Sequence, residues 1–472
     1  MSEQTVYINY PWLNSIWDEK ILALKHRIID YGDVDKIIKY MVEPHYKVGN
    51  DFSNILIQYH AHDNNFITNS TAGGRFPKKF IISELLPFIQ KLALSLPTAF
   101  ANTRIKILKS GKNCRLVLSR MQVACLLAGA FFGVFDSLPP NEICRGYGKP
   151  LSFLSIWKRS DMFILDSIIY YFTRIMNQNP RGDLIIKRLT VGENIPQWDK
   201  IHSDLSHIRI IDKSDILNTK LPLVLHGVSK NMCGGLYGGK NDNPTLSGRN
   251  HHAEEILFAC FPELYIVSMF CEPLGEADIL SVMGAEKFIT HQGFGNNVKF
   301  YQGYNDETVP RSENGTIIRT FVLADVVSVP GQYTEFTDGF IKDLNKVLCG
   351  LNCLKTRKIP VACGLWGSNL HINGEPNKHL KFIQQYMVAS LLESPVSYYA
   401  FDVSLQNEID PFVAEAVEFV SKLNKTRCTV NDLYNAYVVL YKEIQRDILN
   451  TYLTIDLNTI NVFKRVLDLV AK

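Results

Sequence analysis

Hydrophobic positions follow a helical period in the first part of the chain. Between residues 79 and 96 apolar side chains recur every three or four positions, and Pro97 follows as a stop, which predicts a helix. A second predicted helix, 121–135, is apolar all round and has Ser119 as a capping residue. Ser160-Asp161 opens a third amphipathic helix. The first part of the chain is therefore expected to be helical.

After about residue 184 the pattern changes to short apolar runs that alternate with amphipathic stretches. The predicted strands are 184–186, 206–211, 223–225, 264–269, 278–283, 316–327, 359–363 and 396–401. The predicted helices are 253–260, 337–348, 379–393 and 410–423, followed by a helical stretch over 429–470. Strands that alternate with helices predict an α/β fold, in which a sheet lies between layers of helices.

These hydrophobic patterns divide the chain into three predicted parts. Residues 1–75 lack a clean period and end in a turn-rich segment, so we interpret them as an N-terminal appendage. Residues 76–183 form a helical accessory domain, and residues 184–472 form the α/β domain.

Composition and charge narrow the class of protein. In 472 residues, 46% are hydrophobic and 21% charged, which is typical of a folded globular protein. A net charge of +3 is too small to argue for general nucleic-acid binding, and we expect no direct sequence-specific nucleic-acid binding. The ten cysteines are scattered through apolar runs without zinc-ligand spacing, so we expect reduced thiols and no metal. With no secretory pattern and no run of about 18 apolar residues, we expect an intracellular protein, nuclear or cytoplasmic, without a membrane span.

The most informative chemistry lies in two neighbouring segments. Four glycines, Gly234, Gly235, Gly238 and Gly239, allow a backbone to approach a diphosphate or sugar closely because they carry no Cβ. About fifteen residues later Glu254 and Glu255 open an apolar helix, where adjacent side chains diverge by about 100°. One glutamate can then face a substrate while the other anchors the loop, a plan suited to cleaving a nucleotide sugar. A plain turn and a pair of acids that complement the helix dipole are the simpler alternative.

Several segments together resemble the poly(ADP-ribose) glycohydrolase family. The matching segments are 86–97, 118–132, 170–174, 181–182, 253–255, 262–264, 364–367 and 399–401. They follow in order over about residues 80–460, and an ordered series is more specific than any one match. The resemblance implies a macrodomain-like mixed sheet flanked by helices, with a helical N-terminal extension. Residues 184–472 would then be a macrodomain-like catalytic domain.

The resemblance also implies an activity. Members of this family hydrolyse the ribose–ribose bonds of poly(ADP-ribose) and release ADP-ribose without a metal or cofactor, so poly(ADP-ribose) or ADP-ribosylated proteins would be the partners. A Gln-Glu-Glu triplet carries the chemistry: its second glutamate, the acid/base, matches Glu255, and its first, which binds ribose hydroxyls, matches Glu254. A carboxylic acid that protonates the leaving oxygen suits the oxocarbenium-like transition state of glycoside hydrolysis.

Further substrate-binding residues follow from the same resemblance. Trp366 and Gly367 lie in a segment similar to the diphosphate-binding loop of the family, and Phe401 matches an aromatic residue that stacks on adenine. Phe294 stands where the family has a substrate-contacting tyrosine, so a hydroxyl is missing. The simpler alternatives are a tryptophan buried in an ordinary turn and a phenylalanine that belongs to the core.

The sequence departs from the family pattern around the expected site. Leu236 replaces a third glycine, Ala253 replaces the glutamine of the triplet, and 227–230 replaces an Asp-Phe-Ala-Asn segment. The connection 240–252 is long, and a later aromatic position falls near His371. Each lost hydrogen bond weakens binding by roughly 0.5–1.5 kcal/mol.

These departures leave three hypotheses open. The first is a divergent glycohydrolase. The second is a catalytically impaired pseudoenzyme that binds ADP-ribose or poly(ADP-ribose), and the third is a structural or interaction protein that has lost the pocket. His251 and His252 can compensate for lost groups, although we expect them to belong to a solvated loop.

Overall fold

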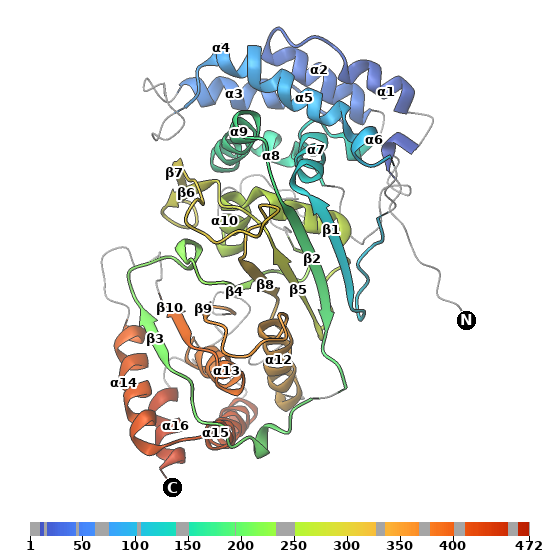
Figure 1. Cartoon of the computed structure of the whole chain (residues 1–472). Helices are drawn as coiled ribbons and strands as arrows, with labels where there is room; N and C mark the ends of the chain where they lie inside the picture. The colour runs from blue at the N-terminus through green and yellow to red at the C-terminus, as the bar shows by residue number, and fades with distance from the viewer. Residues whose placement is uncertain are drawn as a thin grey trace, which may run out of the picture.

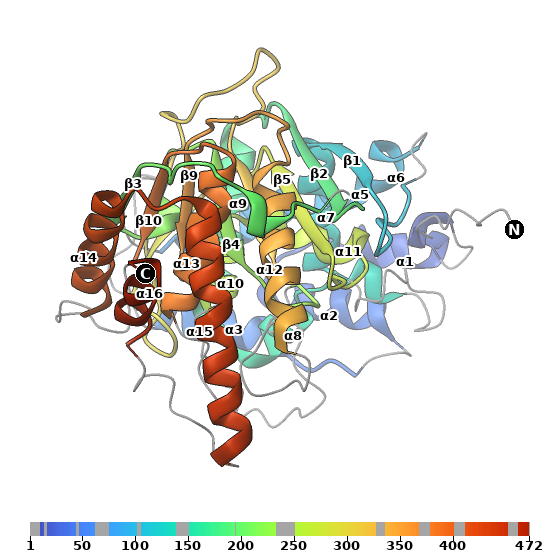
Figure 2. The same ribbon diagram turned by 90° about the horizontal axis from the view of Figure 1, so that it is seen from below.

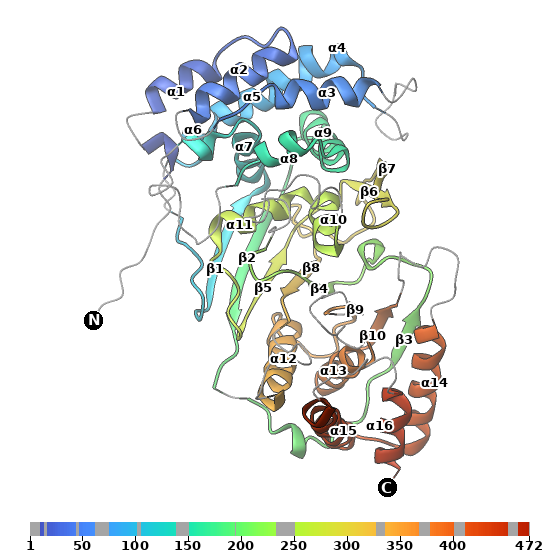
Figure 3. The same cartoon turned by 180° about the vertical axis from the view of Figure 1, so that it is seen from behind.

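A computed structural model gives the architecture of the chain (Figure 1). It describes residues 10–13, 17–43, 47–61, 75–101, 105–137, 151–193, 195–232, 251–326, 336–367, 378–400, 411–451 and 461–471. Helices of the N-terminal part gather at one end, the sheet lies in the middle, and the C-terminal helices cover the other end; the reverse view in Figure 3 shows the same order.

The N-terminal part is mostly helical, and the helices predicted over 79–96, over 121–135 and from Ser160-Asp161 are present. Its helices are α1 (Trp17–Leu24), α2 (Tyr31–Val42), α3 (Asp51–Ala61), α4 (Lys78–Phe80), α5 (Leu86–Leu94), α6 (Leu96–Ala99), α7 (Arg120–Phe131), α8 (Leu154–Arg159) and α9 (Met162–Asn177). The single-turn elements are η1 (Pro11–Leu13), η2 (Ile81–Leu85) and η3 (Val134–Ser137). Ser119 caps α7 by accepting a hydrogen bond from Gln122 N at 3.2 Å, and Asp161 caps α9 by accepting one from Ile164 N at 3.2 Å. Both caps confirm the predicted helix starts.

The helices α1 to α3 were not predicted from the sequence. The side chain of Asp30 accepts a hydrogen bond from the backbone of Asp33, and Asp33 accepts one from the backbone of Asp30, so α2 begins with a capping box. Its apolar residues are buried at helical spacing against the rest of the N-terminal core. The sequence therefore carried a readable signal for α2, which is a helix of 12 residues. The predicted boundaries at 75/76 and 183/184 stay predictions.

Within the described residues, one mixed sheet of eight strands forms the body of the molecule. Its strands are β1 (Cys114–Ser119), β2 (Asp183–Thr190), β3 (Ile208–Ile211), β4 (Leu223–Gly227), β5 (Asp278–Met283), β8 (Thr320–Ala324), β9 (Val361–Gly364) and β10 (Val396–Tyr399). Their order is β1-β2-β5-β8-β4-β9-β10-β3. Pairing is antiparallel from β1 to β8 and parallel from β8 to β3. A separate hairpin pairs β6 (Ile289–Gln292) with β7 (Lys299–Gly303). This confirms the predicted mixed sheet.

One predicted strand is wrong. Residues 264–269 form the end of a 3-10 helix, η6 (Pro262–Ile266), and most of a short helix, α11 (Val267–Phe270). The run is buried throughout, and a short apolar run that is buried on every side has the same composition in a helix as in a central strand.

Helices cover both faces of the sheet. On one face α7 and α10 (Ala253–Cys260) pack against it, and on the other lies α12 (Phe336–Leu351). The remaining C-terminal helices are α13 (Lys378–Leu391), α14 (Pro411–Thr426), α15 (Val430–Thr451) and α16 (Val462–Val470). Figure 2 shows α12, α13 and α15 in front of the strands. The remaining short 3-10 helices are η4 (Trp198–Lys200) and η5 (Ile216–Asn218).

Alternate residues of a central strand enter different cores. In β8, Phe321 and Leu323 belong to the core shared with the N-terminal helices, whereas Val322 and Ala324 belong to the core beneath the C-terminal helices. This follows from the two-residue period of a strand. Because β8, β4, β9, β10 and β3 run parallel, their carboxyl ends meet at one edge, where open α/β sheets bind ligands.

Candidate active site

The ends of three parallel strands meet around one tryptophan. Trp366 follows β9, and its indole N–H donates a hydrogen bond of 3.0 Å to the carbonyl of Ala324 at the end of β8. A Cβ added to Gly227, the last residue of β4, would lie 3.4 Å from Cδ1 of Trp366. The tryptophan therefore joins the carboxyl ends of β8, β4 and β9.

Trp366 presents almost none of its side chain to solvent. It is 2% exposed, and the ammonium of Lys381 lies 5.0 Å from the centroid of its ring. The next residue, Gly367, has a φ of +73°, and a Cβ there would lie 2.6 Å from Cγ2 of Val326. What this segment offers to a ligand is therefore backbone, which is how a diphosphate is usually held in a glycine-containing loop.

The sequence did not reveal what holds this segment. Gln385 on α13 accepts a hydrogen bond from the backbone N–H of Gly364 at 3.3 Å and donates one to its carbonyl at 3.0 Å. One turn earlier, Lys381 forms an ion pair of 2.6 Å with Asp343 of α12, and both side chains are almost fully buried. The only signal in the sequence was that Lys381 and Gln385 are polar residues four positions apart on a helix that begins shortly after a glycine-containing segment.

Glu254 ties α10 to the end of β4. Its Oε2 accepts a hydrogen bond of 2.8 Å from the backbone N–H of Ser229, and its Oε1 accepts one of 3.3 Å from the serine hydroxyl. Ser229 lies two residues after Gly227, the last residue of β4. The first glutamate of the pair is therefore fixed at the carboxyl edge of the sheet.

Glu255 lies in the same first turn and is 9% exposed. Its Oε2 accepts a hydrogen bond of 2.9 Å from the backbone N–H of His252 and so caps the helix. Within the described part of the chain, no hydrogen bond reaches its other oxygen, Oε1. A carboxyl group held by one oxygen can still exchange a proton through the other.

The expectation that both histidines belong to a solvated loop is wrong for His251. His252 is exposed, but His251 is only 7% exposed and its Nε2 lies 3.0 Å from Oδ2 of Asp161. Burial lowers the pKa of His251, and the nearby Asp161 and Glu255 carboxylates oppose that shift. Sequence spacing gave no sign of this contact because the two residues are ninety positions apart.

Phe294 lies close to the start of α10. Its neighbour Gly295 pairs with His251 through two backbone hydrogen bonds of 3.3 and 3.2 Å. The Phe294 ring is partly buried against the core that includes α10. The structure therefore brings Phe294, Glu254 and Glu255 into one neighbourhood.

The remaining predicted site residues lie outside the described residues. These are Gly234, Gly235, Gly238, Gly239 and Phe401, together with Leu236 and His371. Among the residues that the structure does describe, no group of three or more His, Cys, Asp or Glu side chains is arranged to hold a metal ion. Likewise, no helix in the described ranges is both long and apolar enough to cross a membrane.

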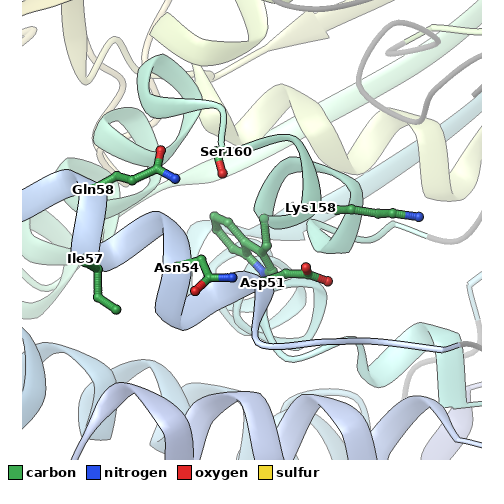
Figure 4. Close-up of a pocket in the computed structure, with 7 residues that line it drawn as sticks. Asp51, Asn54, Ile57, Gln58, Lys158 and Ser160 are labelled. Carbon is green, nitrogen blue, oxygen red and sulfur yellow. The ribbon is translucent and has the colours of Figure 1, made fainter. Parts of the chain in front are cut away.

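A cavity of 280 Å³ lies elsewhere, between α3 and the end of α8 (Figure 4). Its lining residues are Asp51, Asn54, Ile57, Gln58, Trp157, Lys158 and Ser160. None of the predicted site residues lines it, so we assign it no part in the site.

A mixed sheet with a buried glutamate pair near its carboxyl edge, packed against a helical layer, defines a macro domain with a helical extension. Comparison with known families agrees: the macro domain fold of poly(ADP-ribose) glycohydrolase (PARG) matches residues 195–407, and the helical domain of the same family matches residues 77–188. The chain belongs to the poly(ADP-ribose) glycohydrolase family.

Individual relatives are distant. The chain is 24% and 23% identical to poly(ADP-ribose) glycohydrolases 1 and 2 of Caenorhabditis elegans, and 26% identical to poly(ADP-ribose) glycohydrolase 1 of Arabidopsis thaliana. These alignments cover 60%, 60% and 58% of this chain. They cover 36%, 57% and 51% of the three relatives, so the chain spans between about a third and somewhat over half of their length.

Proposed function

We propose that this protein hydrolyses the ribose–ribose glycosidic bonds of poly(ADP-ribose) and releases ADP-ribose, with Glu255 as acid/base. The observation that carries the proposal is the buried Glu254–Glu255 pair in the first turn of α10, with Glu254 bonded to Ser229 at the end of β4. Family membership supports the same chemistry, and the three similar proteins are named as poly(ADP-ribose) glycohydrolases.

The two carboxylates have different surroundings, which suits different roles. Both oxygens of Glu254 accept hydrogen bonds from Ser229, so Glu254 is oriented and suited to hold ribose hydroxyls. Glu255 keeps Oε1 available for proton transfer. In the proposed reaction, protonated Glu255 gives its proton to the leaving ribose oxygen as the glycosidic C–O bond breaks. The resulting carboxylate then takes a proton from the water that attacks the anomeric carbon.

The segment after β9 supports the binding half of the proposal. Gln385 forms hydrogen bonds with both the N–H and the carbonyl of Gly364, and Trp366 is buried between the strand ends. These contacts hold the backbone from 364 to 367 at the carboxyl edge of the sheet. Backbone N–H groups at this edge suit the diphosphate of ADP-ribose.

A non-catalytic ADP-ribose binder is the second candidate. The observation in its favour is the altered contact set, with Ala253 in place of glutamine and Phe294 without a hydroxyl. These changes lower affinity and rate without removing either glutamate.

Release of ADP-ribose from purified poly(ADP-ribose) tests the proposal. We expect turnover by the native chain and its loss in Glu255→Ala, with Glu418→Ala, an exposed glutamate on α14, as a control that retains activity. If the native chain shows no turnover, the proposal fails. Calorimetric titration with ADP-ribose would then separate a binder from a protein that has lost the pocket.

A further inference from the structure

A residue of the helical part contacts the segment that leads into α10. Asp161, at the start of α9, lies with its two carboxylate oxygens 3.1 and 3.0 Å from Nε2 of His251. The side chains are 10% and 8% exposed. Oδ1 of the same carboxylate accepts the capping hydrogen bond from Ile164 N. One side chain therefore joins α9 to the start of α10.

Asp161 is itself held in place. Ser160 ends α8 in the left-handed conformation, with a φ of 53°, so the chain turns sharply from α8 into α9. Phe163, in the first turn of α9, packs edge-on against the His251 ring with centroids 5.4 Å apart. The imidazole is thus fixed by a hydrogen bond at its edge and by an aromatic ring beside it.

The backbone of His251 is fixed as well. It exchanges two hydrogen bonds with Gly295, and the next residue, His252, donates its N–H to Oε2 of Glu255. The His251 carbonyl that accepts from Gly295 and the His252 N–H that orients Glu255 therefore belong to the same peptide unit. A displacement of His251 would move that amide, and misplacing a reacting group by about 1 Å can lower a rate about a hundredfold.

We propose that His251 is a positioning residue: through Asp161 it holds the first turn of α10, and with it Glu255, against α9 of the helical part. This inference rests on the proposed function for its effect on rate. The contact itself is independent of that function. It also gives the helical part a role at the active site, because Asp161 acts on Glu255 through His251 without touching the substrate.

Two substitutions of Asp161 distinguish its capping hydrogen bond with Ile164 from its contact with His251. Asparagine and serine both replace aspartate well as helix caps, so both keep α9 capped. Asparagine retains an oxygen that can accept from the imidazole N–H, whereas serine is too short to reach it. We expect Asp161→Asn to keep kcat within about threefold of the native value, and Asp161→Ser to lower kcat about tenfold with KM nearly unchanged.

Substitution of His251 provides a second test of the proposal. His251→Phe keeps an aromatic ring against Phe163 but has no N–H, so we expect the same fall in kcat as in Asp161→Ser. His379→Phe is the matched control, because His379 makes a similar contact, 2.7 Å to Glu415, between α13 and α14. It should leave kcat unchanged. Equal kcat in all folded variants, or equal losses in Asp161→Asn and Asp161→Ser, would overturn the proposal.

Amide hydrogen exchange tests the contact without any reaction. In Asp161→Ser the hydrogen-bonded amides of His251, His252 and Ile256 should exchange about tenfold faster than in Asp161→Asn, while amides in α15 do not change. If the native chain has no turnover, the proposed function fails and this measurement still decides the inference. Equal exchange in the two variants would contradict it.

Discussion

The ammonium of Lys381 lies 5.0 Å from the ring centroid of Trp366 and 2.6 Å from Oδ2 of Asp343. A buried charge pair between α12 and α13 thus supports the residue that joins the ends of β8, β4 and β9. The pair is almost fully removed from solvent, so each charge depends on the other for its stability in the fold.

Removing one member of this pair should destabilise the protein strongly. Lys381→Met removes the ammonium that balances buried Asp343, and we expect the free energy of unfolding to fall by about 3–5 kcal/mol. The double change Lys381→Met with Asp343→Leu should recover most of the loss. Chemical denaturation measures both. Arg357→Met, which breaks an exposed pair with Glu393, should cost under about 1 kcal/mol; similar losses at the two sites would contradict the role given to Lys381.

A methyl group at Gly367 should disturb the segment proposed to bind diphosphate. The φ of +73° and the 2.6 Å approach to Val326 make Gly367→Ala strained, and we expect a loss of roughly 1–3 kcal/mol in stability. ADP-ribose affinity, measured by calorimetry, should fall about tenfold or more. Gly192→Ala is the control, because a Cβ there meets nothing within 4 Å. Unchanged affinity in Gly367→Ala would remove this segment from the binding site.

Asp136 makes stability depend on pH. Burial raises its pKa to about 7, and no described residue supplies a hydrogen bond to its Oδ2. The folded state therefore favours the protonated carboxyl. The preference of the fold for the protonated carboxyl contributes fully to the free energy of unfolding below the unfolded pKa of about 3.9. This contribution is lost as the pH rises to about 7.

The neutral variant Asp136→Asn should remove this dependence. We expect it to raise the free energy of unfolding by roughly 2 kcal/mol or more at pH 8 and to have little effect near pH 4. Denaturation curves at the two pH values give the comparison, with Asp468→Asn on the exposed side of α16 as the control. An equal effect of Asp136→Asn at both pH values would contradict the raised pKa of Asp136.

The sequence predicted elements well where local chemistry decides the outcome. The predicted helix 253–260 and strand 278–283 coincide with α10 and β5, since turn residues and charges bound each of them. The run 264–269 was wrongly predicted as a strand because it is buried on all sides, so its apolar composition carried no period that distinguishes a strand from a helix. Helix α2 was missed although its apolar residues at helical spacing and its capping box at Asp30 and Asp33 were both readable.

For the site, residue types were easier to predict than partners. Glu254 and Glu255 were chosen because two carboxylates open an apolar helix, and the structure puts them beside the end of β4. The contact of Glu254 with Ser229 spans 25 positions, and that of His251 with Asp161 spans 90. Such contacts arise only when β4, α9 and α10 pack together, and no local period encodes them.

One comparison of rates decides whether Glu255 acts as the acid/base. ADP-ribose release from poly(ADP-ribose) should be measured for the native chain, Glu255→Gln and Glu254→Gln, with ADP-ribose binding followed in parallel. We expect Glu255→Gln to lower kcat about 10²–10⁴-fold while binding is retained, because the amide cannot transfer the proton. Glu254→Gln should mainly weaken binding. A native rate that persists in Glu255→Gln would exclude Glu255 as the acid/base.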